Sequence, residues 1–128
     1  MKDFPELTLP FSVRDYECDL QGIVNHAVYL HYFEHARHEY LKEMGFSFAE
    51  LTSQNKFLVI AKAEVTYKRS LHSGDSFHVV SQMTLPKQLK AVFLQKIIHD
   101  VDSRIMVEAE MTIAYLVNGR PSAFSELF

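Results

Sequence analysis

The sequence predicts an α+β domain in which one long helix is wrapped by a curved antiparallel sheet of about five strands. Residues His26–Met44 repeat apolar side chains at helical spacing, whereas the chain from Phe57 onward alternates with a period of two. The breaks between the later apolar runs are short, which favours antiparallel hairpins. One helix covers only one face of such a sheet, so we expect the sheet to curve around it.

The composition indicates one ordinary globular domain over residues 1–128, since 48% of the residues are hydrophobic and 23% are charged. The net charge of −3 argues against a nucleic-acid partner, which favours a basic excess. A single cysteine allows no intrachain disulfide and favours a reducing compartment. The first residues lack the apolar core of a signal peptide, and no window approaches a membrane span. We therefore expect a cytoplasmic protein with no membrane partner.

The first strand and the helix follow from local signals. Thr8–Arg14 is a short apolar run interrupted by Pro10, which predicts an edge strand. Asn25 can cap the long helix and Gly45 can end it. A weaker pattern over residues 47–55 suggests a further short helix. The helical stripe that should face the core consists of Tyr29, Phe33, Ala36, Tyr40 and Met44.

Four strands are expected after the helix, from alternating apolar positions bounded by turn residues. They lie within Ala61–Lys68, Phe77–Leu85, Leu89–Ile98 and Ile105–Val117. The third of these also has an apolar second face, made by Val92, Leu94 and Ile98, which favours assembly. Long open sheet edges favour pairing with a second copy.

The candidate site is the loop that precedes the long helix. The first N–H groups of a helix have no internal partner and favour negative charge, so they can hold an oxyanion. Asp19 lies a few residues upstream, where a carboxylate can attack a carbonyl or activate water, and Gly22 allows close approach of a ligand. The alternatives are a turn-forming Asp19 and a structural His26. Asp15 and Glu17 are expected to be solvated.

A longer pattern resembles a known family. It reads Asp19-x-x-Gly22-Ile-Val-Asn25-His26-x-x-Tyr29-x-x-Tyr32-Phe33-Glu34-x-x-Arg37, with Ser70-Leu-x-x-Gly74-Asp75 and Asn118-Gly119-Arg120-Pro121 further on. These residues are similar to the signature of the hotdog-fold acyl-CoA thioesterases of the 4-hydroxybenzoyl-CoA thioesterase group. The resemblance covers nearly the whole chain and implies a hotdog fold.

The resemblance implies roles for the residues that match the motif. The catalytic carboxylate of the family falls on Asp19, and the backbone that holds the thioester oxygen falls on Val24, Asn25 and His26. His26 also matches a histidine that orients substrate or water in some relatives. Some of those relatives carry a tyrosine where this chain has Asp15, with Tyr16 one place further on.

The function implied is hydrolysis of an acyl-CoA to the free acid and coenzyme A, without a cofactor, by a homodimer or homotetramer. Asp19 acts as nucleophile or as general base. The family likeness implies an acyl pocket lined by the helix stripe and a neighbouring subunit, with Tyr29, Phe33 and Phe57 as candidates and core packing as the alternative. The pantetheine arm would run between subunits, with Lys68, Arg69 and Arg120 as candidates for the phosphates and solvated charge as the alternative. The alternatives are a non-catalytic binding module for acyl-CoA or acyl-carrier protein, an acyl-carrier-protein thioesterase, and a hydratase or dehydratase on the same fold.

Two other groups of residues are weaker candidates for a functional site. His31, His35 and His38 share a helix face and have spacing that can ligate zinc, but this face points away from the predicted core, so we expect a solvated or interface surface and no metal site. Cys18 lies beside Asp19, whose charge opposes thiolate formation. The chain contains no phosphate-binding glycine loop and no Gly-x-Ser-x-Gly motif.

Overall fold

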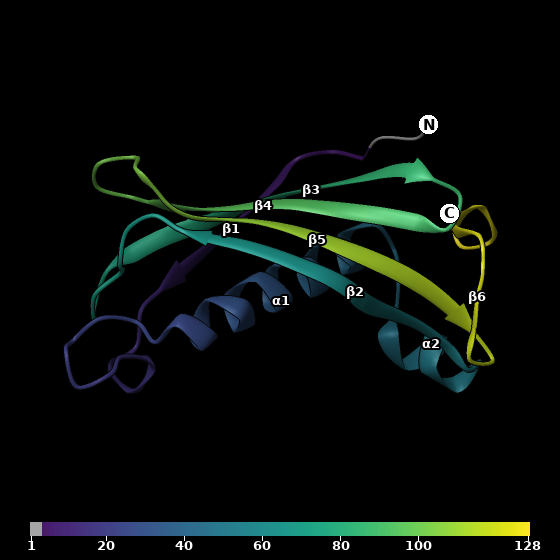
Figure 1. The fold of residues 1–128 in the computed structure, drawn as a ribbon, viewed down its shortest axis with the longest axis horizontal. Coiled ribbons are helices and arrows are strands. Elements are labelled where there is room, and N and C mark those ends of the chain that lie inside the picture. Colours follow the sequence, from purple (N-terminus) through teal and green to yellow (C-terminus); the bar gives the residue numbers. More distant parts are fainter. Residues whose placement is uncertain (1–3) are drawn as a thin grey trace.

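The computed structural model describes residues 4–128 and shows a long helix held under a curved sheet (Figure 1). In chain order the elements are β1 (Leu7–Ser12), a 3-10 helix (Asp15–Glu17), α1 (His26–Glu43), α2 (Phe48–Ser53), β2 (Lys56–Tyr67), β3 (Ser76–Lys87), β4 (Lys90–His99), β5 (Ile105–Val117), β6 (Arg120–Pro121) and a second 3-10 helix (Phe124–Glu126). The predicted α+β class with one long helix is confirmed.

The strands form one sheet in the order β1-β3-β4-β5-β2, and the two-residue β6 pairs with β5. Every pairing is antiparallel. β1 and β2, which flank α1 in sequence, therefore lie at opposite edges of the sheet. Within residues 4–128, no helix has the length and apolarity needed to cross a membrane.

The helix α1 forms where the sequence predicts it, because Asn25 caps its first turn. The Asn25 side chain accepts a hydrogen bond of 2.9 Å from the Ala27 N–H. Gly45 follows the helix with a φ of 93°, a left-handed conformation that suits glycine. The core-facing side chains of α1 pack against those of β3, β4 and β5; the buried members of α1 are Tyr29, Tyr32, Phe33, Ala36, Arg37, Tyr40 and Leu41.

A buried polar cluster that the sequence did not predict joins α1 to the sheet. Arg37 donates from Nη1 to Gln95 Oε1 at 3.1 Å. Gln95 in turn donates from Nε2 to the Phe33 carbonyl and to Ser81 Oγ, each at 3.0 Å. Arg37, Gln95 and Ser81 are all buried. Burial lowers the pKa of the Arg37 guanidinium below its usual value, although the nearby Glu34 charge opposes this.

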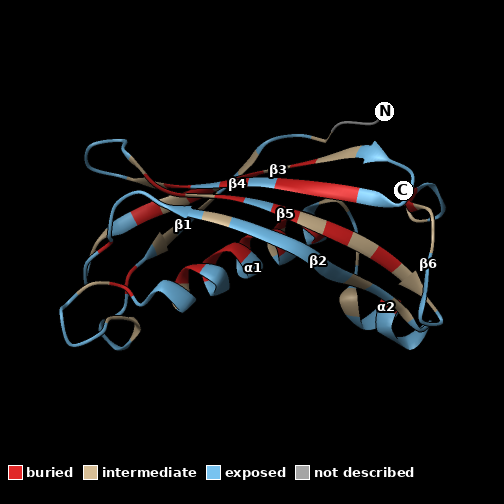
Figure 2. Cartoon of the chain, viewed as in Figure 1, coloured by how far each residue is buried: buried red, intermediate tan, exposed pale blue. Residues whose placement is uncertain are grey.

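The edge strand β2 is exposed along most of its length (Figure 2). Its register against β5 shifts between Ile60 and Lys62, which marks a β-bulge. Before the bulge, Leu58 and Ile60 lie opposite Tyr115 and Ile113, two buried residues of β5. After it, the helix-facing positions of β2 are Ala63, Val65 and Tyr67, because these lie opposite Met111, Ala109 and Val107. The outer edge of β2 pairs with no strand among the described residues.

Candidate active site

The loop before α1 is a small hairpin whose two sides run antiparallel. Cys18 and Val24 form a bridge, the Asp19 N–H donates to the Ile23 carbonyl at 2.9 Å, and the Asn25 N–H donates to the Glu17 carbonyl at 3.1 Å. The tip closes with a bond of 3.0 Å from the Gly22 N–H to the Asp19 carbonyl. Gly22 has a φ of 80°, which explains the glycine at this position.

The Asp19 carboxylate takes part in this turn and keeps one oxygen free. Its Oδ1 accepts from the Gln21 N–H at 2.8 Å, and the side chain is exposed. Within residues 4–128, Oδ2 accepts no hydrogen bond. The turn-forming role and the chemical role considered for Asp19 are thus compatible, since one oxygen fixes the carboxylate and the other faces solvent.

Most backbone N–H groups at the start of α1 already donate a hydrogen bond within the protein. The Val24 N–H donates to the Leu71 carbonyl at 2.9 Å and the Asn25 N–H is bonded within the loop. The Ala27 N–H is taken by the Asn25 cap. The His26 N–H is therefore the one in this group that has no acceptor among the described residues. An oxyanion beside it would receive this hydrogen bond and the favourable helix dipole.

Asp19 and the start of α1 share one surface cleft with the end of β2. The residues that line the cleft are Asp19, Ile23, Val24, His26, Tyr29, Tyr67, Lys68, Arg69 and Ser70. Six of the residues singled out in the sequence therefore lie together: Asp19, Val24, His26, Tyr29, Lys68 and Arg69. Gly22 and Asn25 shape the loop and the helix cap beside it. Tyr67 and Ser70 were not predicted as site residues, because no local pattern in the sequence indicates that this segment reaches the start of α1.

Two tyrosines hold the cleft in shape. Tyr67 donates from its phenol to the His26 carbonyl at 3.0 Å. The buried Tyr29 accepts at its phenol oxygen from the Leu71 N–H at 2.9 Å, and burial raises the pKa of that phenol. The two rings contact each other at 5.6 Å between centroids. The start of α1 is thereby tied to β2 and to the segment that follows β2.

The expectation that Glu17 is solvated is wrong. The Glu17 carboxylate accepts from the Tyr32 phenol at 2.8 Å and from the Arg14 N–H at 2.8 Å, and it is largely buried. Asp15 is exposed, as expected, and also accepts from Ser73 Oγ, which connects the loop to the turn before β3. Both carboxylates therefore brace the loop. Tyr16, the tyrosine adjacent to the family position, is 77% exposed and does not line the cleft.

Cys18 lies within the loop but has an environment unsuited to a nucleophile. Burial raises the pKa of its thiol, and the charges of Asp15 and Asp19 raise it further. A raised pKa leaves less thiolate at neutral pH. The sequence-based argument against Cys18 as nucleophile is consistent with this environment.

The remaining candidates lie outside the cleft. Phe33 has no exposed surface and packs in the core. Arg120 pairs with Val117, which lies opposite Lys56 at the far end of β2 from Tyr67. Phe57 also belongs to that end and is half exposed. Within one chain, Arg120 therefore lies far from Lys68 and Arg69.

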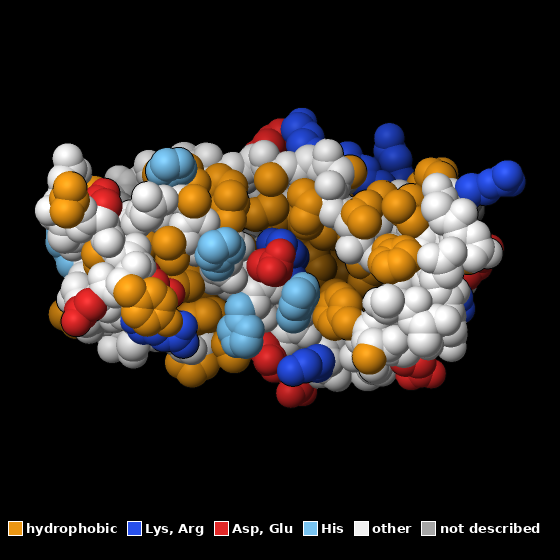
Figure 3. Space-filling model, turned by 90° about the horizontal axis from the view of Figure 1, so that it is seen from below, with side chains coloured by type: hydrophobic (Ala, Val, Ile, Leu, Met, Phe, Trp, Pro, Cys, Tyr) orange, Lys and Arg blue, Asp and Glu red, His pale blue; other side chains and the backbone are white. Residues whose placement is uncertain are grey.

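The three helical histidines lie on the exposed side of α1, where histidine side chains gather beside a hollow lined by hydrophobic groups (Figure 3). No group of three metal-ligating side chains is found among residues 4–128. His35 contacts the Phe11 ring and His38 contacts the Phe48 ring, with centroids 5.7 and 4.5 Å apart.

The sequence of the chain matches a known family. The model of the Thioesterase-like superfamily matches residues 13–127. The chain belongs to this superfamily. A crystal structure of a probable thioesterase from Bartonella henselae superposes with a TM-score of 0.85, covering 93% of this chain and 98% of that chain at 24% identity. This likeness confirms the predicted hotdog fold.

Two curated relatives show the range of proteins to which the chain is similar. The chloroplastic acyl-acyl carrier protein thioesterase ATL3 of Arabidopsis thaliana is 32% identical over 118 residues, which are 92% of this chain and 61% of the relative. The acyl-CoA thioester hydrolase YbgC of Escherichia coli is 28% identical over 104 residues, which are 81% of this chain and 77% of the relative. The chain spans about three fifths of the length of the plant relatives.

Proposed function

We propose that the chain hydrolyses an acyl thioester at the cleft between the Asp19 loop, the start of α1 and the end of β2. One observation carries the proposal: the same cleft contains an Asp19 oxygen that accepts no hydrogen bond from the protein and a His26 N–H that donates none. Relatives named as acyl-CoA and acyl-acyl carrier protein thioesterases support this chemistry.

In the proposed reaction the thioester carbonyl lies against the start of α1. In the general-base form, Asp19 accepts a proton from water and the water oxygen bonds to the carbonyl carbon. The resulting oxyanion accepts the hydrogen bond from the His26 N–H. Collapse breaks the carbon–sulfur bond and releases the thiolate, which takes up a proton. In the nucleophilic form, Asp19 itself bonds to the carbonyl carbon and the carbon–sulfur bond breaks, which releases the thiolate. Water then hydrolyses the resulting anhydride to the free acid and regenerates the Asp19 carboxylate.

The His26 side chain has a proposed role distinct from its main chain. The imidazole is exposed on the cleft wall and is free of hydrogen bonds within residues 4–128. It is therefore available to orient the substrate or the attacking water. The bond from Tyr67 fixes its main chain, so the side chain can reorient without moving the N–H that faces the oxyanion.

The carrier of the acyl group is proposed to be coenzyme A or an acyl-carrier protein, both of which bring a phosphate on a pantetheine arm. Lys68 and Arg69 lie on the cleft and can meet such a phosphate. Lys68 also pairs with Glu108 at 3.5 Å, whereas Arg69 forms no ion pair within residues 4–128. The cytoplasmic location remains a prediction.

A homodimer is proposed through the open edge of β2. A strand that pairs with itself about a two-fold axis runs antiparallel to its copy. If the pairing is centred on Ala63, each Lys62 faces the Glu64 of the other copy, which places opposite charges across the strands. The Arg120 end of one copy then approaches Lys68 and Arg69 of the other, so a role for Arg120 at the phosphates requires the dimer. Association into a tetramer remains a prediction.

The proposal is tested by mixing the protein with acyl-CoA substrates and a thiol-detecting reagent. Catalytic release of thiol, at many equivalents per subunit, is the expected result. Saturable binding without thiol release would replace the enzyme with a binding module. Acyl-CoA and acyl-acyl carrier protein substrates with the same acyl group, compared by kcat/KM, would identify the carrier.

A further inference from the structure

Histidines and aspartates gather in two neighbouring turns at one end of the sheet. One turn precedes β3 and the other joins β4 to β5, and both lie at the same end of the molecule as the start of α1 (Figure 1). We call these residues the histidine–aspartate cluster; its members are His72, His78, His99, Asp75, Asp100 and Asp102. None of the six lines the cleft, so the proposed reaction gives the cluster no role so far.

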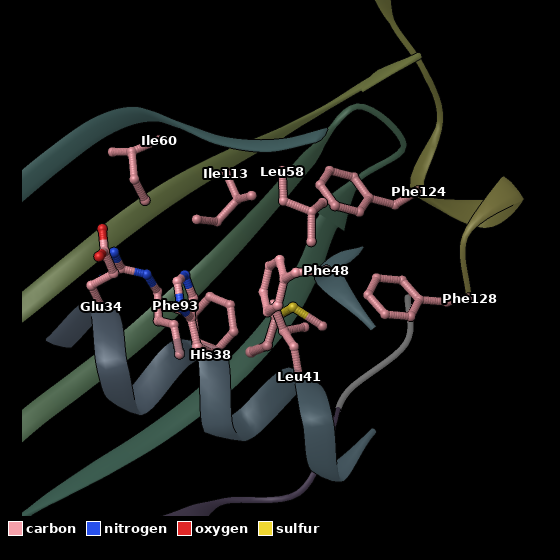
Figure 4. Close-up of a pocket in the computed structure, with 12 residues that line it drawn as sticks. Glu34, His38, Leu41, Phe48, Leu58, Ile60, Phe93, Ile113, Phe124 and Phe128 are labelled. Atoms are coloured by element: carbon pink, nitrogen blue, oxygen red, sulfur yellow. The ribbon is translucent and has the colours of Figure 1, made fainter. Parts of the chain in front are cut away.

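The histidine–aspartate cluster is also separate from the apolar cavity beside the second half of α1 (Figure 4). Leu41, Phe48 and Phe124 point into that cavity from α1, α2 and the C-terminal segment. No member of the cluster lines it. A substitution in the cluster therefore leaves the side chains that line the cleft and the cavity unaltered, and it can act on the cleft only through the backbone that connects them.

The backbone of residues 71 and 72 holds the second arm of the loop before α1. The Val24 N–H donates to the Leu71 carbonyl at 2.9 Å, and Ile23 forms an antiparallel bridge with His72. The Leu71 N–H donates to the Tyr29 phenol at 2.9 Å. Residues 71 and 72 therefore fix both the arm that leads into α1 and a tyrosine of the cleft wall.

The Asp75 carboxylate sets the shape of this segment. Its Oδ2 accepts from the His72 N–H at 2.8 Å, while the Asp75 N–H donates to the His72 carbonyl at 3.0 Å. The same turn is joined to the end of β1, because the Gly74 N–H donates to the Val13 carbonyl at 3.1 Å and the Val13 N–H donates to the Asp75 carbonyl at 2.9 Å. One carboxylate oxygen thereby fixes the residue that bridges to the loop before α1.

His99, at the end of β4, lies against the same carboxylate. Its Nδ1 accepts from the Val101 N–H at 3.1 Å, so in the neutral ring the proton is on Nε2. Nε2 lies 3.4 Å from Asp75 Oδ2, which places a polar N–H beside the carboxylate charge. The two side chains are only 15% and 25% exposed, so water competes little with this contact. Asp102 Oδ1 lies 3.9 Å from Nδ1, beyond hydrogen-bond distance, and does not share in it.

We propose that Asp75 is a positioning residue for the proposed thioester hydrolysis and that His99 orients its carboxylate. This inference rests on the proposed function and specifies what keeps the Asp19 carboxylate and the His26 N–H in place. Asp75 contacts neither substrate nor attacking water. It acts through residues 71 and 72, which hold the arm of the loop that leads into α1.

Steady-state kinetics of Asp75 variants are the first test. Asp75→Ala removes the acceptor of the His72 N–H, so kcat for acyl-CoA hydrolysis should fall about 10- to 100-fold while KM changes less than about twofold. Asp75→Asn keeps an oxygen that can accept the same N–H and should recover most of kcat; it also serves if the alanine variant does not fold. An unchanged kcat in folded Asp75→Ala, or a loss in Asp75→Asn as large as in Asp75→Ala, would overturn the proposal.

Asp100→Ala is the matched control, because Asp100 contacts a histidine in the same cluster. Its Oδ1 lies 2.7 Å from His78 Nδ1, closer than Asp75 lies to His99. Within residues 4–128 its carboxylate forms no hydrogen bond or ion pair with the loop before α1 or with residues 71 and 72. Asp100→Ala should lower the midpoint of urea unfolding and keep the wild-type kcat. A fall in kcat as large as in Asp75→Ala would assign the effect to general loss of stability and overturn the proposal.

Two variants of His99 test its part in the proposal. His99→Leu removes the N–H beside Asp75 and should lower kcat about fivefold, the size expected for loss of one weak hydrogen bond. His99→Gln supplies an amide N–H near the place of Nε2 and should restore most of that loss. Wild-type kcat in His99→Leu would overturn the orienting role of His99.

Amide hydrogen exchange gives a readout that needs no turnover. In Asp75→Ala the Val24 N–H should exchange about tenfold faster, because the segment that carries its acceptor is less firmly held. The N–H of Ile97, a fully buried residue of the central strand β4, should change less. Equal acceleration at both amides would indicate global destabilisation and contradict the proposal. Retained turnover in Asp19→Asn would reject the proposed function, whereas selective exchange at Val24 would still support the tie between Asp75 and the loop.

Discussion

The Tyr67 phenol donates a hydrogen bond of 3.0 Å to the main-chain carbonyl of His26, so the last residue of β2 is fastened to the first residue of α1. This contact joins the edge strand to the helix end at the cleft. We expect this contact to couple the position of the sheet edge to that of the N–H proposed to hold the oxyanion.

Replacing Tyr67 with phenylalanine tests that coupling. Loss of one hydrogen bond should lower the free energy of unfolding by about 1 kcal/mol. It should also lower kcat more than it raises KM, because the helix start is less firmly positioned. Urea unfolding and steady-state kinetics measure both effects. Tyr16→Phe, at a 77% exposed ring, is the control and should change neither; a similar loss in both variants would argue against a positioning role for Tyr67.

Substitution of Gln95 should lower the stability of the protein more than substitution of most other polar residues of the core. Gln95→Leu leaves the buried Arg37 guanidinium without its acceptor, so the free energy of unfolding should fall by about 3 kcal/mol. The double variant Arg37→Leu, Gln95→Leu should recover much of this loss, because no unpaired charge remains. Chemical denaturation measures both, and Lys96→Leu on the exposed neighbouring position is the control. Additive losses in the double variant would contradict the account.

The thiol of Cys18 should react slowly. Burial and the charges of Asp15 and Asp19 raise its pKa, so a smaller fraction is thiolate at pH 8 than in a free cysteine. Alkylation by iodoacetamide should therefore be slower than for free cysteine and should accelerate at higher pH. Asp19→Asn removes one of these charges and should speed the reaction. The Cys18→Ser variant should hydrolyse acyl thioesters at the wild-type rate. A loss of turnover in this variant would indicate that Cys18 takes part in catalysis.

Lys68 and Arg69 should contribute to binding of the carrier and not to binding of the acyl group. Replacing both with alanine should raise KM for an acyl-CoA by about tenfold, since each exposed contact to a phosphate contributes modestly. The corresponding acyl-pantetheine lacks the nucleotide phosphates and serves as the internal control, with an unchanged KM. An equal rise for both substrates would assign these residues to the acyl group or to folding.

The sequence predicts the fold well because the strongest signals are local. Asn25 and Gly45 delimit α1 to within one residue of its observed end, and the Ile105–Val117 alternation gives β5 its observed bounds. The signal fails at β2, which begins at Lys56 rather than Ala61, because the bulge after Ile60 interrupts the alternation. Phe57–Ile60 therefore follow a different phase from the residues that come after the bulge.

In the candidate site, too, the residues that local signals indicate were predicted and those brought in by the fold were missed. Asp19 and His26 are near in sequence, and the helix-end argument finds them without coordinates. Tyr67 reaches the cleft only because β2 returns to the start of α1, so no local pattern indicates it. The buried pair Arg37 and Gln95 is also hidden, since charged and amide side chains are expected at the surface and their pairing joins distant segments.

We propose that the free oxygen of Asp19 acts on a thioester held against the electropositive end of α1. Asp102 is a matched residue, because its Oδ1 accepts from the Arg104 N–H at 3.0 Å in the same kind of turn, away from the cleft. The most direct measurement is kcat for acyl-CoA hydrolysis in Asp19→Asn and Asp102→Asn. We expect a fall of about 10²–10⁴-fold in the first and wild-type turnover in the second, with unchanged unfolding curves. Wild-type turnover in a folded Asp19→Asn protein would contradict the account.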